Sequence, residues 1–180
     1  MTDKRNSQKL ANEGRMAYQR GDYTAAAQAF MSAAEVFTAD GDKIAAAEMQ
    51  NNRSVALLQS GEAKEALQAV RGTDAIFAEA GDIRRQALAI GNQAAALDKL
   101  GRLEAAATAY EKSAELLLEV GNNDLRASVL QSLSAVQLRQ GCQLEAIATM
   151  QAGLEEVKHP SPKQNIVKKL LQIPYKFMNR

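Results

Sequence analysis

Few side chains in this sequence are suited to covalent chemistry. It contains one cysteine, Cys142, and one histidine, His159, which precedes Pro160. A cysteine nucleophile needs a neighbouring base such as histidine, and a structural or catalytic metal needs several such ligands. Cys142 falls at a predicted hairpin turn with no histidine close in sequence, and no second Cys or His completes a metal site. We therefore expect a protein that is not an enzyme, with no catalytic residue, metal or cofactor.

The most regularly spaced polar side chains are amides. Asn12, Asn52 and Asn92 recur at a step of forty residues, and Ser132 takes the fourth position of this asparagine column. Asparagine within a helix costs about 0.5 kcal/mol or more relative to alanine, so some interaction should favour it there. Its amide offers one donor group and one acceptor, which match the N–H and C=O of a peptide backbone. The column is therefore a candidate for binding an extended peptide.

Glycines indicate how these residues are positioned. A glycine can end a helix in a left-handed turn without steric cost. Seven of them fall on a twenty-residue grid: Gly21, Gly41, Gly61, Gly81, Gly101, Gly121 and Gly141. The polar residues that follow, such as Asp42 and Asp82, are suitable N-caps. The grid predicts helices over about 3–19, 23–39, 43–59, 63–79, 83–99, 103–119, 123–139 and 143–158.

Apolar and small residues repeat at the forty-residue step. One column is Ala26, Ala66, Ala106 and Ala146, a second is Phe30, Val70, Tyr110 and Met150, and a third is Gly14, Ser54, Ala94 and Ser134. A pair of helices of this size buries its apolar face only by stacking on its neighbours. We therefore expect one extended all-α domain of four helical hairpins, at about 1–40, 41–80, 81–120 and 121–160.

These columns resemble the tetratricopeptide repeat signature: a small residue in the first helix, then an alanine and, four residues later, a large apolar residue in the second. Gly14 with Ala26 and Phe30 follows it. The resemblance covers roughly residues 8–158, without the tryptophan or closing proline of the common repeat. It is similar to the long-helix repeats of kinesin light chains and spindle-orientation adaptors, and implies a right-handed α-α superhelix. A HEAT-like solenoid is the alternative fold.

The resemblance also implies a concave groove lined by the first helix of each pair, with the asparagine column facing it and holding a peptide lengthwise. Same-face neighbours become cationic towards the C-terminal end, so we expect a protein or peptide partner with an acidic side chain or a terminal carboxylate there. The candidate peptide-binding residues are Asn12, Asn52, Asn92, Ser132, Arg15, Gln19, Gln59, Lys99 and Arg139. In the alternative interpretation, the asparagines bond between adjacent helices and only fix their stacking.

The segment 161–180 differs from the repeats in charge. Lys158 to Arg180 holds six cationic residues and no acid, and Ile166, Leu170 and Ile173 follow helical spacing. We expect a basic amphipathic helix that caps the last repeat, which would otherwise expose an apolar face. The alternative is contact with an anionic membrane or an acidic partner through Lys163, Lys168, Lys169 and Lys176.

Composition sets the remaining expectations. No apolar run approaches the roughly 20 residues of a membrane span, and residues 1–12 lack the apolar core of a secretory signal. A single cysteine suits a reducing compartment, so we expect a cytoplasmic protein. The aromatic residues fall in predicted core columns and leave no stacking platform for nucleic acid. Self-association into a homodimer stays open.

Overall fold

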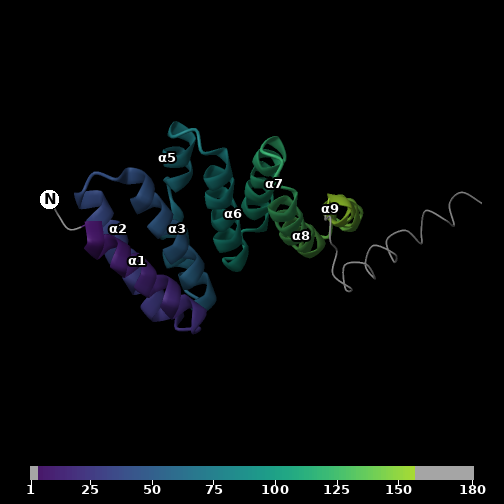
Figure 1. Cartoon of the computed structure of the whole chain (residues 1–180). Helices are drawn as coiled ribbons and strands as arrows, with labels where there is room; N and C mark the ends of the chain where they lie inside the picture. The colour runs from purple at the N-terminus through teal and green to yellow at the C-terminus, as the bar shows by residue number, and fades with distance from the viewer. Residues whose placement is uncertain (1–3, 157–180) are drawn as a thin grey trace, which may run out of the picture.

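The computed structural model describes residues 4–156, and these form nine α-helices joined by short turns. The helices follow one another in a row along the molecule (Figure 1), and consecutive helices pack on each other except α4 and α5, which both pack on α3 and α6 instead. They are α1 (Lys4–Gln19), α2 (Tyr23–Ala39), α3 (Lys43–Ser60), α4 (Ala63–Val70), α5 (Thr73–Glu79), α6 (Ile83–Lys99), α7 (Leu103–Glu119), α8 (Asn123–Arg139) and α9 (Gln143–Glu156). The expected all-α class is confirmed for this part of the chain.

The glycine grid ends the helices as predicted. All seven grid glycines are left-handed, with φ between 65° at Gly121 and 90° at Gly61. Asp42 and Asp82 then accept a hydrogen bond from the third residue after them, at 3.0 Å from the N–H of Ala45 and 2.8 Å from that of Arg85. Each turn therefore ends one helix and starts the next.

The prediction of a continuous helix over residues 63–79 is wrong. Helix α4 stops at Val70, Arg71 is extended with φ −61° and ψ 126°, and Gly72 is left-handed with φ 76°. Glycine makes this conformation accessible and is itself a weak helix former. The Thr73 hydroxyl donates to the Val70 carbonyl at 2.8 Å, so that carbonyl keeps a partner. The corresponding stretches of α2 and α7 continue unbroken.

Most members of the predicted columns lie in the core, although Met150 is only partly buried. Ala26, Ala66, Ala106 and Ala146 are at most 1 % exposed. Gly14 packs so closely on Phe30 that an added Cβ would lie 2.7 Å from the ring. The core therefore depends on small residues that let helices approach closely, alternating with large ones that fill the space between them.

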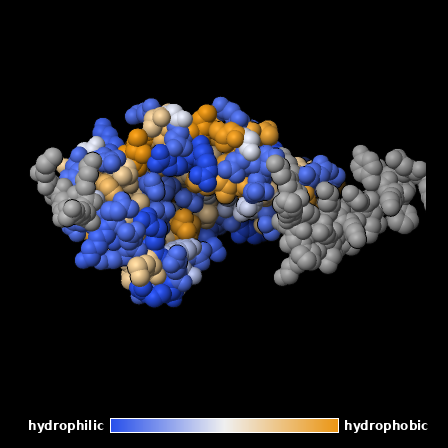
Figure 2. Space-filling model, viewed as in Figure 1, coloured by the Kyte–Doolittle hydropathy of each residue, from blue (hydrophilic) through white to orange (hydrophobic). Residues whose placement is uncertain are grey.

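Apolar side chains also reach the surface at some helix ends. Figure 2 shows hydrophobic residues gathered along the upper edge of the molecule. Leu118 and Val120, at the end of α7, are exposed, as are Leu144 and Ile147 on α9. No helix within residues 4–156 has the length and apolar character needed to cross a lipid bilayer. The predicted helix in 161–180, with Lys163, Lys168, Lys169 and Lys176, lies outside the described residues.

Candidate peptide-binding surface

A pocket of about 370 Å³ lies where α1, α2 and α3 meet, and we call it the α1–α3 pocket. It brings together three of the predicted site residues, Arg15, Gln19 and Asn52. Its complete lining is Arg15, Tyr18, Gln19, Phe30, Glu48, Asn52 and Val55. Two successive first helices, α1 and α3, therefore contribute to one cavity.

The walls of this pocket combine an apolar base with polar groups. Phe30 is 3 % exposed, and the Tyr18 ring packs edge-on against Tyr23 with centroids 5.3 Å apart. Helical spacing of three and four residues places Glu48, Asn52 and Val55 on one face of α3. Such a pocket can hold an apolar or amphipathic side chain while the amides around it bond to backbone groups.

Asn12 does not line the α1–α3 pocket. It is exposed on α1, and its Oδ1 accepts a hydrogen bond from Nη2 of Arg15, one turn further along the same helix. The first member of the asparagine column therefore contacts the α1–α3 pocket only indirectly, through the guanidinium of Arg15.

Asn92 bonds between helices. Its Nδ2 donates to Oδ1 of Asn51 at 3.2 Å, and the buried Asn51 donates in turn to the Ala47 carbonyl at 3.0 Å. At this one position the structure shows the interaction that the stacking interpretation requires, since it joins α3 to α6.

Ser132 is also engaged within the protein. Its hydroxyl donates to the Ser128 carbonyl at 3.3 Å. Burial raises the pKa of Tyr110, and a side-chain hydrogen bond with Ser132 opposes that rise. The fourth member of the column therefore contacts the core residue Tyr110.

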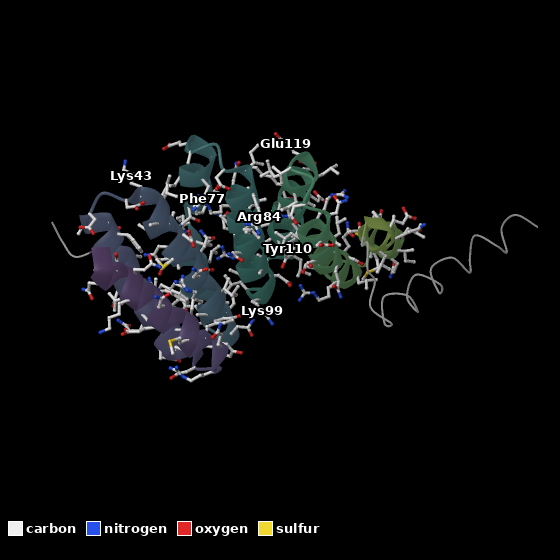
Figure 3. The ribbon with its side chains drawn as sticks, viewed as in Figure 1. Lys43, Phe77, Arg84, Lys99, Tyr110 and Glu119 are labelled. Carbon is white, nitrogen blue, oxygen red and sulfur yellow. The ribbon has the colours of Figure 1, made fainter. Side chains whose placement is uncertain are left out.

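The cationic end of the predicted groove is partly neutralised. Arg139 on α8 forms an ion pair with Asp98 on α6. Lys99 is exposed near the end of α6 (Figure 3) and has no ion-pair partner within residues 4–156. Gln59 is exposed on α3 and outside the α1–α3 pocket. Lys99 therefore supplies an exposed positive charge at this end that no acidic side chain of residues 4–156 neutralises.

Arg85, on α6, forms an ion pair with Glu48, which lines the α1–α3 pocket. Its Nε lies 2.7 Å from Oδ2 of Asp82, its Nη1 lies 3.2 Å from Oε2 of Glu48, and its guanidinium lies 5.2 Å from the Phe77 ring centroid. The hydrogen bond to Asp82 raises the pKa of Arg85. The backbone N–H of Arg85, followed by its side chain, lowers the pKa of Asp82.

Sequence reasoning missed the residues that bridge neighbouring first helices: Asn51, Arg85 and Asp98. Two of these bridges follow a regular separation in the sequence. Asn92 and Asn51 are 41 residues apart, and Arg139 and Asp98 have the same separation. A search of the sequence for complementary polar side chains 41 residues apart, one more than the repeat length, identifies both pairs.

Comparison with protein-family models and with curated proteins finds no match to the chain. Within residues 4–156, no three His, Cys, Asp or Glu side chains are grouped so that they could bind a metal ion. What the surface can do therefore follows from its own geometry, which offers hydrogen bonding, charge and an apolar pocket.

Proposed function

We propose that this protein is a non-enzymatic interaction module of tetratricopeptide-like repeats that binds an extended segment of a partner protein. One observation supports this above the others: Arg15, Gln19 and Asn52, from two successive first helices, line one pocket. A peptide crossing from α1 to α3 would meet all three.

The environment of Asn52 suits it to bind a peptide backbone. Its side chain is partly exposed, and it makes no side-chain hydrogen bond to any residue within 4–156. Both its donor and its acceptor are therefore available to a peptide N–H and C=O. A peptide side chain would occupy the space between Tyr18, Phe30 and Val55.

Charge sets the preferred sequence of the ligand. Arg15 at the α1–α3 pocket and Lys99 near the end of α6 are exposed cations. A guanidinium binds carboxylates through two parallel N–H groups. The proposed ligand therefore carries an acidic residue or a terminal carboxylate beside the side chain that enters the α1–α3 pocket.

The superhelical groove is part of this proposal. The helices form a row (Figure 1), and the first helices α3 and α6 contact each other directly as well as through the second helices. That arrangement supports a continuous surface formed by α1, α3, α6 and α8, along which a peptide would lie.

A peptide-display selection tests the proposal. We expect the wild-type protein to enrich acidic peptides, and Asn52→Ala and Arg15→Ala each to weaken the best peptide by about tenfold in fluorescence polarisation. Gln28→Ala is the matched control, because it removes an exposed amide from α2, outside the α1–α3 pocket and outside the candidate residues. If no peptide is enriched, or if all four proteins bind the best peptide equally, the α1–α3 pocket is not a peptide-binding site.

A further inference from the structure

A second pocket, of about 480 Å³, lies beside the break between α4 and α5, and we call it the α3–α5 pocket. Its walls come from the end of α2, from α3 and from both halves of the broken helix. The lining residues are Thr38, Lys43, Ala46, Ala47, Gln50, Arg53, Glu65, Gln68, Ala69, Arg71, Thr73 and Ile76.

The α3–α5 pocket is separate from the candidate peptide-binding surface. Helix α3 contributes to both pockets, but through opposite faces. At about 100° per residue, the five α3 residues that line the α3–α5 pocket lie roughly 180° around the helix from Glu48, Asn52 and Val55. A ligand in one pocket would not contact the other.

The lining is rich in positive charge. Lys43, Arg53 and Arg71 contribute three cations against one acid, Glu65, a net charge of +2. None of the three cations has an ion-pair partner within the part of the chain that the structure describes. Lys43 lies at the N-terminal end of α3 (Figure 3), and α3 and α5 are in contact. Free cations gathered around one cavity favour an anionic ligand.

The other lining residues indicate which groups the ligand carries besides its negative charge. Oε1 of Gln50 is a buried acceptor without a hydrogen-bond partner, so a ligand hydroxyl could donate to it. Ala46, Ala47 and Ile76 offer apolar contact. The volume lies within the range of about 300–1,000 Å³ that small-molecule sites occupy.

The helix break contributes one of the three cations of this site. Arg71 lines the α3–α5 pocket from an extended backbone, which the left-handed Gly72 permits. The second helices α2 and α7, which have 17 residues each, show no such break. The α3–α5 pocket is therefore a local departure from the repeat, located in the second unit.

We propose that the α3–α5 pocket binds a small hydroxylated phosphate monoester through Lys43, Arg53 and Arg71. A phosphate monoester carries about −1.5 to −2 charges at pH 7, which complements the net lining charge of +2 better than a single carboxylate does. Guanidinium groups match the oxygen geometry of phosphate.

Isothermal titration of the full chain tests the proposal, with ribose 5-phosphate, ribonate and ribose as probes. We expect ribose 5-phosphate to bind, ribonate to bind at least about tenfold more weakly, and neutral ribose not to bind. The Arg53→Gln, Arg71→Gln double variant should lose about tenfold or more in affinity. Lys64→Gln is the control, because Lys64 is exposed on α4 and outside the α3–α5 pocket.

Three results would overturn it: no saturable binding of ribose 5-phosphate at millimolar concentration, equal affinity in the double variant, or equal affinity for ribonate. A phosphoserine peptide that bound while ribose 5-phosphate did not would overturn the assignment to a small molecule. If the double variant unfolds, Lys43→Gln serves in its place, since Lys43 is exposed at the start of α3.

Discussion

At the scale of single residues, one sequence column holds side chains with three different tasks. Asn12 bonds to Arg15 on its own helix, Asn52 lines the α1–α3 pocket, and Asn92 bonds to Asn51 on a neighbouring helix. Identical spacing sets the face of the helix on which each amide lies. Whether a partner is within reach depends on which side chains the adjacent helices present.

This difference predicts unequal effects on stability. Asn92→Ala should lower the free energy of unfolding by roughly 1–3 kcal/mol, because it leaves the buried Oδ1 of Asn51 without its donor. Asn52→Ala should change it by less than about 0.5 kcal/mol, because Asn52 is only partly buried and makes no side-chain hydrogen bond within residues 4–156. Urea denaturation measures both. Equal destabilisation by the two variants would assign Asn52 a structural role and remove the main support for peptide binding.

A second residue-scale prediction concerns Asp82 and pH. Its pKa is lowered from 3.8 in the folded protein, chiefly by the N–H of Arg85 and then by its side chain. Because the folded pKa lies below the unfolded value, Asp82 stabilises the fold above pH 3.8, and this contribution is lost as the pH falls through the folded pKa. Asn at this position still caps α6 but cannot form the ion pair.

We therefore expect Asp82→Asn to be less stable than the wild type by about 0.5–1 kcal/mol at pH 7, since the ion pair is only partly buried. The difference should shrink as the pH falls below 3.8. Urea denaturation at a series of pH values measures it. A difference that stayed constant with pH would show that the charge of Asp82 does not contribute.

At the scale of elements, the break between α4 and α5 shows where regular spacing fails. Val70 and Phe77 both remain in the core, so the segment keeps its packing on either side of the interruption. Gln93 of α6 donates to Oδ1 of Asp74 at 3.0 Å and to the Val70 carbonyl at 3.5 Å, which fixes both halves on the same neighbour. The break is therefore held by contacts from outside the segment as well as by Gly72.

Gly72→Ala tests that reasoning. An added Cβ meets no atom within 4 Å, but alanine is strained at φ 76°. We expect a loss of roughly 1–2 kcal/mol in the free energy of unfolding. Ser32→Ala, at the matching position of the unbroken α2, is the control and should change stability by less than about 0.5 kcal/mol. Unchanged or increased stability of Gly72→Ala would mean that residues 63–79 accept a continuous helix.

At the scale of the whole molecule, the last helix within residues 4–156 is α9, which carries apolar side chains on its surface. Leu144 is 80 % exposed and Ile147 is 43 % exposed. A terminal repeat normally needs a cover for the face that would otherwise pack on a following unit. We retain as a prediction that the segment 161–180 provides this cover.

A double-mutant cycle measures that contact. In the full chain, Leu144→Ser with Ile147→Ser should lower the melting temperature by several degrees, because the cover loses apolar area. In a chain that ends at residue 160, the same two substitutions should have little effect. Equal shifts in the two chains would show that 161–180 does not contact this face of α9, and would favour a role in binding a partner or a lipid surface.

The amino-acid sequence alone predicted most of the helices, their turns and most residues of the core, but not the break within residues 63–79. Glycine at φ near 75°, an Asp cap and a buried alanine are properties of a residue and its near neighbours, so a forty-residue pattern predicts them. It also predicted Arg15, Gln19 and Asn52 as members of one candidate surface, and the structure shows these three residues lining one pocket. Which polar groups stay available to a ligand depends on the tertiary structure, because hydrogen bonds such as Asn92 to Asn51 and ion pairs such as Arg139 to Asp98 join helices distant in sequence. The break at Arg71 and Gly72 also depends on the tertiary structure. A single glycine interrupts a helix where the surrounding helices can satisfy the backbone groups that the interruption frees. The break places Arg71 beside Lys43 and Arg53 at the α3–α5 pocket.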